Sequence, residues 1–120
     1  MNLEDRLTGI RSSIERLERR PAPVATFNPQ TASYTLAIGD ANKVVELNKA
    51  TANTVTVPPN SAVPFPVGTI VEVAQYGAGA TTVAAGAGVT LRGTLTVPAQ
   101  YATVKLIQRA VNEWYVLGGA

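Results

Sequence analysis

The chain has 120 residues, enough for one domain with an appendage, and carries ten Lys and Arg against eight Asp and Glu. It contains no cysteine and no histidine, which excludes a disulfide framework, a Cys/His zinc site and a catalytic triad that uses either residue. We therefore expect no metal and no cofactor. The charges divide evenly, with nine in residues 1–20 and nine in the rest. Neither part forms a basic patch, so we expect no binding to nucleic acid.

Residues 1–20 are predicted to form an amphipathic helix that brings copies of the chain together. The apolar side chains of this segment recur at spacings of four and three residues, at Leu3, Leu7, Ile10, Ile14 and Leu17. This is the narrow seam of a short coiled coil, and Pro21 ends the helix. The helix could instead fold back onto its own domain, but a docked helix usually has a wider apolar face. Because two and a half heptads are short, the rest of the chain should supply most of the stability of the oligomer.

Residues 21–33 contain three prolines and no charge and are predicted to be an extended linker. From residue 34 to residue 120 the pattern alternates with period two and predicts an all-β domain. The expected strands are 34–38, 43–47, 54–57, 69–76, 80–84, 89–97, 102–108 and 113–117. The fold class is thus mainly β, a small antiparallel β-sandwich or barrel preceded by an N-terminal α-helix. No apolar run is long enough to span a membrane, and the amino terminus does not resemble a signal segment, so we expect no membrane association.

The alternation also predicts the core. One face of each strand should be buried, with Tyr34, Leu36, Ile38, Val45, Leu47, Val55, Val57, Val71, Val73, Val104, Leu106, Trp114 and Val116 facing inward. The GDAN segment at 39–42 is expected to form a hairpin turn. The similarity of 54–60 to 94–100 raises the hypothesis of two related halves, with chance resemblance of Thr/Val-rich strands as the alternative.

Two loops and a set of aromatic residues are candidates for contact. The loop 58–68 is rich in proline, so it either presents an apolar side chain to a partner or covers one end of the core; its candidate contact residues are Pro58, Pro59, Pro64, Phe65 and Pro66. Residues 77–88 are almost all small, which fits either close packing between subunits or a hairpin with flexible tips. The tyrosines and Trp114 could form a platform for a sugar ring, although aromatic residues in alternating strands usually belong to the core.

Catalysis would have to come from the four carboxylates of the β domain. Glycoside cleavage needs two carboxyl groups that face one another, and the spacing of Asp40, Glu46, Glu72 and Glu113 does not indicate such a pair. We therefore expect no enzymatic activity.

Several segments after Tyr34 resemble a β domain of tailed-bacteriophage virion proteins. They are D-x-x-K-V-V-E-x-N at 40–48, T-V-T-V-P-P-N-S at 54–61, F-P-V-G-T-x-V-E-V at 65–73, G-x-G-V-T-L at 86–91 and N-E-W-Y-V-L-G at 112–118. Domains of this kind occur in tail-fibre tips and in head-decoration or head-fibre proteins, commonly as trimers. The resemblance transfers no catalytic residue.

The resemblance implies a structural protein of the virion. Because the chain is too short to contain a long fibre shaft, we expect a homotrimer that decorates the capsid and binds the major capsid protein, after synthesis in the host cytoplasm. The alternative is a short tail-fibre or baseplate tip protein that binds a tail protein and recognises a host-surface glycan.

Overall fold

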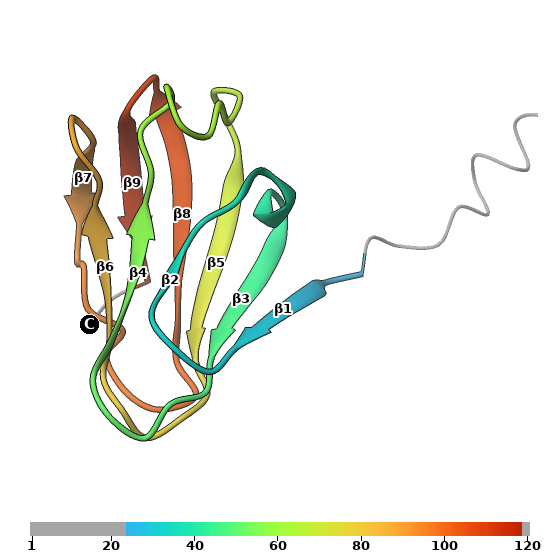
Figure 1. Cartoon of the computed structure of the whole chain (residues 1–120), viewed down its shortest axis with the longest axis vertical. Helices are drawn as coiled ribbons and strands as arrows, with labels where there is room; N and C mark the ends of the chain where they lie inside the picture. Colours follow the sequence, from blue (N-terminus) through green and yellow to red (C-terminus); the bar gives the residue numbers. More distant parts are fainter. Residues whose placement is uncertain (1–23, 119–120) are drawn as a thin grey trace, which may run out of the picture.

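The computed structural model describes residues 24–118. These residues form a mainly β domain of nine strands in two facing sheets (Figure 1). The predicted helix over residues 1–20 and its apolar seam, Leu3, Leu7, Ile10, Ile14 and Leu17, lie outside the described residues, so they remain predictions.

The larger sheet has six strands in the order β1-β3-β5-β8-β9-β7, and the smaller sheet has three in the order β2-β4-β6. The strands of the larger sheet, in that order, are Thr26–Gln30, Lys43–Leu47, Ile70–Gln75, Thr103–Ala110, Glu113–Leu117 and Thr90–Gly93. Those of the smaller sheet are Tyr34–Thr35, Asn53–Val57 and Thr81–Ala85. One short 3₁₀ helix, Ile38–Asp40, lies between β2 and β3.

Up to β6 the chain passes from one sheet to the other after each strand, so that successive strands of each sheet run parallel (Figure 1). Five of the seven strand pairings are parallel, and only β5 with β8 and β8 with β9 are antiparallel. The prediction of a two-layer β fold is confirmed, but the prediction that it is antiparallel is wrong. Apart from the hairpin of β8 and β9, the strands are joined by coils of the kind that β-solenoids repeat.

Two of these coils match residue for residue. Val45 pairs with Val73 and Asn53 pairs with Thr81, so both sheets hold the same offset of 28 residues. The corners between the sheets, 48–52 and 76–80, therefore have equal length and stack. The hydroxyl of Thr81 donates to the side-chain oxygen of Asn53 at 2.7 Å, which joins the corners below the surface.

Glycine allows the corners to approach each other closely. The amide of Gly77 donates to the carbonyl of Leu47 at 3.0 Å, and the amide of Gly79 donates to the carbonyl of Lys49 at 2.9 Å. A Cβ atom at Gly77 would collide with the backbone of Lys49, and one at Gly79 with the backbone of Thr51. The small residues of 77–88 thus serve packing within the chain, which neither interpretation of that segment anticipated.

The core lies between the two sheets. Its buried hydrophobic residues are Leu36, Val45, Leu47, Val55, Val57, Phe65, Val71, Val73, Val83, Val89, Val97, Val104, Leu106, Trp114 and Val116. Eleven of the thirteen predicted core residues are among them. Tyr34 is only half-buried and Ile38 is exposed, because β2 ends at Thr35 and the following segment turns into the 3₁₀ helix.

Two further predictions about the chain path are wrong. Residues 26–30, expected within the linker, form β1 at the edge of the larger sheet, where Pro29 is tolerated because only one side of the strand is paired. The segment 39–42 is not a hairpin turn, since it joins strands of different sheets.

The two similar stretches are also not equivalent. Residues 54–57 belong to the parallel strand β4, whereas in 94–100 only Thr96 forms an isolated antiparallel bridge. The strands that follow differ too, because β5 and β6 lie in different sheets while β8 and β9 are antiparallel neighbours. The hypothesis of related halves is therefore wrong.

Gly79→Ala should destabilise the domain by several kcal/mol, because the added methyl group collides with the backbone of Thr51, which cannot move without separating the corners. Gly39→Ala is the matched control, since no atom lies within 4 Å of its added Cβ, and it should change stability by less than about 1 kcal/mol. Urea unfolding followed by circular dichroism measures both. Equal stability of the two variants would contradict the close-packed corner.

Candidate functional site

The outward face of the six-stranded sheet is the candidate functional surface. The register places outward residues in rows across neighbouring strands, and one row runs Phe27, Val44, Glu72, Lys105 and Leu117. A second row runs Ile70, Ile107, Tyr115 and Arg92. Outward positions of a two-layer fold usually carry polar side chains, so apolar residues in both rows mark this face as unusual.

The face is hollowed around Glu72. Three shallow depressions lie on it, and Glu72 lines each of them. Its carboxylate lies 3.8 Å from the ammonium nitrogen of Lys105, which lines two of the three. Both side chains are partly exposed, so we expect this ion pair to contribute little to stability.

One of these depressions has an aromatic rim. It measures about 450 Å³ and is lined by Phe27, Tyr76 and Tyr101 together with the carboxylates Glu46 and Glu72, among others. The rings of Tyr76 and Tyr101 meet edge to face at 5.8 Å. Both are exposed, Tyr76 by 52% and Tyr101 by 71%. A pair of exposed rings beside carboxylates can stack on a sugar and accept hydrogen bonds from its hydroxyl groups.

The loop that carries Tyr101 is fixed to the end of β5. The amide of Tyr101 donates to the carbonyl of Gln75 at 2.6 Å, and the amide of Gln75 donates to the carbonyl of Ala102 at 3.1 Å. The side chain of Gln100 donates to the carbonyl of Tyr76 at 3.1 Å. Tyr101 has a φ of 68°, which is uncommon for a bulky residue. The backbone that carries its ring is therefore fixed at the end of β5.

The carboxylate of Asp40 has a structural role. It is buried and accepts hydrogen bonds from the side chain of Asn28 at 2.7 Å, the hydroxyl of Tyr34 at 2.7 Å and the amide of Ala37 at 2.8 Å. These contacts join β1, β2 and the 3₁₀ helix. Desolvation, and then the hydrogen bond to Asp40, raises the pKa of Tyr34 above its ordinary value of 10.0.

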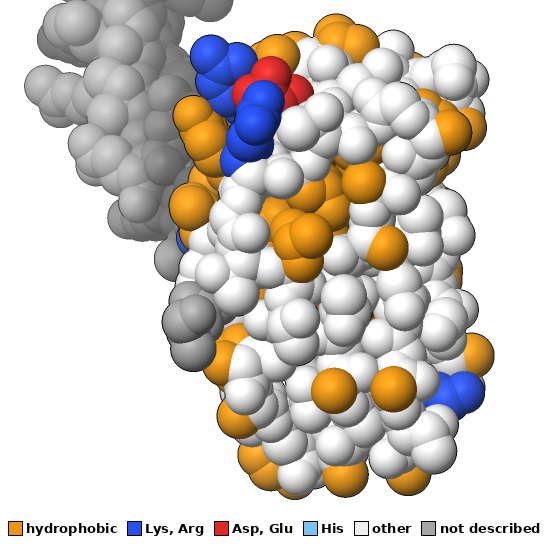
Figure 2. All heavy atoms as spheres, turned by 90° about the vertical axis from the view of Figure 1, so that its left-hand side faces the viewer, with side chains coloured by type: hydrophobic (Ala, Val, Ile, Leu, Met, Phe, Trp, Pro, Cys, Tyr) orange, Lys and Arg blue, Asp and Glu red, His pale blue; other side chains and the backbone are white. Residues whose placement is uncertain are grey.

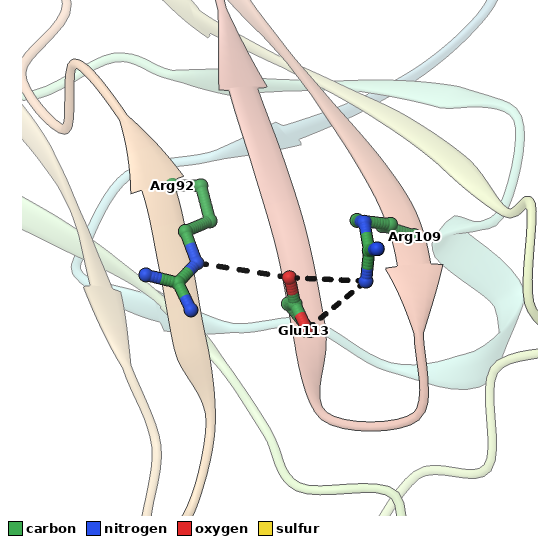
Figure 3. A network of polar contacts seen from close by, with 3 residues as sticks. All are labelled: Arg92, Arg109 and Glu113. Atoms are coloured by element: carbon green, nitrogen blue, oxygen red, sulfur yellow. Dashed lines mark hydrogen bonds and ion pairs between the residues drawn. The ribbon is translucent and has the colours of Figure 1, made fainter.

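Glu113 on β9 lies between two arginines of neighbouring strands (Figure 3). The guanidinium of Arg109 donates to both of its carboxylate oxygens at 3.3 Å, and Arg92 lies 3.6 Å from one of them. Seen from the side of β6 and β7, acidic and basic side chains gather together at one end of the domain, one further basic side chain lies toward the other end, and most of the visible surface is uncharged or hydrophobic (Figure 2).

Two of the four carboxylates considered for catalysis share a depression. Glu46 and Glu72 lie on the adjoining strands β3 and β5 at diagonal positions, since Val44 pairs with Glu72 and Glu46 pairs with Ala74. Asp40 and Glu113 lie in the separate networks described above. The sequence spacing indicated no pair among the four carboxylates, and strand alternation alone could not place Glu46 and Glu72 together.

The candidate contact loop 58–68 covers the core. Phe65 is buried and meets Trp114 edge to face at 5.6 Å, so its side chain packs in the core of the described domain and is not exposed for a partner, which agrees with the alternative of a cover over the core. Pro58 is buried and Pro59 half-buried, whereas Pro64 and Pro66 remain exposed. Only these last two still offer the predicted contact surface.

Within residues 24–118 no group of three or more carboxylates could hold a metal ion, and no helix is long and apolar enough to cross a membrane. No protein-family model, no curated protein and no solved structure matches the chain.

Tyr34→Phe should lower the free energy of unfolding by about 1–2 kcal/mol at neutral pH, because Asp40 loses a hydrogen-bond donor. Since the pKa of Tyr34 is raised by folding, its contribution is fully present below about pH 10 and is lost as the pH rises through the folded-state value. The variant should therefore lose less stability than the wild type above pH 10. Urea titrations between pH 7 and pH 11 test this, with Tyr115→Phe, outside the Asp40 network, as the control that keeps the wild-type pH dependence.

Proposed function

We propose that the chain is a non-enzymatic structural protein of a tailed-phage virion, a homotrimer that decorates the capsid by binding the major capsid protein. The observation that supports this most is the outward face of the six-stranded sheet, which exposes large apolar side chains in a chain with only 15% charged residues. Exposed apolar patches usually mark protein contacts. The resemblance of segments between residues 40 and 118 to phage virion domains supports this kind of assembly.

The contacts that the carboxylates make also agree with a structural role. Asp40 joins three segments by hydrogen bonds, Glu113 pairs with two arginines, and Glu72 pairs with Lys105. A general acid or base would need a carboxylate that is poised toward a substrate. We infer that Asp40 stabilises the fold and that Glu72 and Glu113 form surface ion pairs, and that none of these three carries a reaction.

In a trimer, modest contacts made by each domain would be sufficient for stable binding to the capsid. Three identical domains can engage symmetric sites on a shell at once, so that the first contact raises the effective concentration of the second and third. A protein of this size can then bind stably without a deep pocket. The position of the protein on the virion separates this proposal from its alternative.

Antibodies against the full chain should label the head of the virion that carries it, with many sites on each particle, because a decoration protein follows the lattice of the capsid. Immunogold electron microscopy of intact particles measures the positions, and particles that lack the protein serve as the control. Label confined to the tail would overturn the decoration proposal and favour the second candidate.

That second candidate is recognition of a host-surface glycan at the tip of a tail. Its specific support is the depression with the aromatic rim, where Tyr76 and Tyr101 are exposed and held by the fixed loop. The nearby carboxylates favour a neutral or amino sugar over an anionic one.

On a glycan array, a tail-tip protein should bind a defined set of neutral or amino sugars. Tyr76→Ala combined with Tyr101→Ala should lower that binding at least tenfold, because stacked rings contribute on the order of 1–3 kcal/mol. Tyr115→Ala, an exposed tyrosine elsewhere on the sheet, is the matched control and should bind as the wild type does. Absence of binding to any glycan by the wild type would end this candidate.

A further inference from the structure

The two outer faces of the domain differ in chemistry. On the three-stranded sheet, the side chains that point away from the core are small, with Thr54, Thr56, Thr82 and Ala84 on β4 and β6. On the six-stranded sheet, the corresponding positions hold large apolar residues, of which Phe27 is 57% exposed and Leu117 47%. We call the outward residues Phe27, Val44, Ile70, Tyr115 and Leu117 the apolar face. The smaller sheet shows what a solvent-facing layer of this domain looks like, and the apolar face departs from it.

The mixture of acidic and basic residues on the apolar face favours a second copy of this chain as its partner. Glu46, Glu72, Lys43 and Lys105 line the shallow depressions, and Arg92 lies in the second outward row. A surface that carries charges of both signs can complement a rotated copy of itself. A strongly acidic or strongly basic partner would meet like charges there.

The described chain begins at the rim of the apolar face. Val24 and Ala25 line the depression that also contains Val44 and Ile70. The predicted helix ends at Arg20, and only residues 21–23 separate it from Val24. The four Cα–Cα steps from Arg20 to Val24 span about 14 Å at most. Helices that bundle in parallel would therefore bring the first described residues of several copies close together, and the apolar faces with them.

We propose that the apolar face is the surface through which copies of this chain meet, around the same axis as the helices. The proposal rests on the homotrimer put forward above and adds which part of the β domain forms the interface. It accounts for the large side chains of the six-stranded sheet, for their mixed charges and for the position of Val24 in one arrangement.

The test adds charges that the single domain tolerates. Val44 pairs with Glu72 across β3 and β5, and Leu117 pairs with Lys105 across β8 and β9. In the double variant Val44→Lys/Leu117→Glu, each new charge therefore faces an opposite charge on the neighbouring strand. The fold should survive, whereas an interface would have to bury both charges.

The matched control is Ile38→Lys/Val111→Glu, which adds the same charges at two apolar positions that are 54% and 59% exposed and lie off the apolar face. Sedimentation equilibrium of the full chain gives the dissociation constant of each protein, and circular dichroism checks the fold. We expect a wild-type trimer, a control within threefold of it, and at least a tenfold weaker trimer for Val44→Lys/Leu117→Glu. If that variant does not fold, Phe27→Ser on the edge strand β1 should weaken the trimer in the same direction.

The possible failures are distinguishable. A wild-type trimer that neither Val44→Lys/Leu117→Glu nor Phe27→Ser weakens would overturn the apolar-face interface and leave the proposed trimer intact. Equal weakening by the control would also overturn the interface, because the effect would not be specific to this face. A wild-type monomer at 100 μM (about the upper end of practical concentrations) would overturn the trimer and the interface together.

Discussion

The stacked corners of the two matching coils are the constraint on which the rest of the domain depends. Their backbones approach so closely that Gly77 and Gly79 have no room for a Cβ atom, and the Asn53 to Thr81 hydrogen bond joins them below the surface. Because both corners have the same length, the offset of 28 residues is the same in both sheets. A slip of one residue in either sheet would turn a set of buried valines to the solvent. The corners thus fix the register, and the register fixes which residues form the core and which form the outer faces.

Local patterning predicts much of this arrangement. The strands at 43–47 and 113–117 have the predicted bounds, and Trp114 is buried as expected, because alternation between core and solvent is a property of each strand alone. The pairing of strands is not local. Short alternating runs separated by turn residues fit a hairpin and a coil between sheets equally well, so the parallel topology could not be obtained from them. The repeat of 28 residues would have indicated the parallel pairing. This repeat consists in the equal lengths of the corners and not in similar amino-acid sequences.

The candidate surface could not be predicted from the sequence, for a related reason. Phe27 lies in a proline-rich stretch without charge, which is typical of a linker, yet the stretch completes the edge of the larger sheet. Glu46 and Glu72 are 26 positions apart and meet only because β3 and β5 are neighbours. For Phe65 the sequence left two possibilities open, because an apolar residue in an irregular loop can face a partner or the core. Only the packing against Trp114 decides between them. Sites assembled from several strands become visible only when the topology is known.

The asymmetry between the outer faces also bears on how an oligomer of this chain would be regulated. The predicted helix is short for a coiled coil, and the apolar face is shallow and interrupted by the Glu72 to Lys105 ion pair. Neither element alone is built for tight association. Joined by a short spacer, each would raise the effective concentration of the other, so assembly would require both at once. A protein built in this way would stay monomeric while it is dilute and would become multivalent as it accumulates.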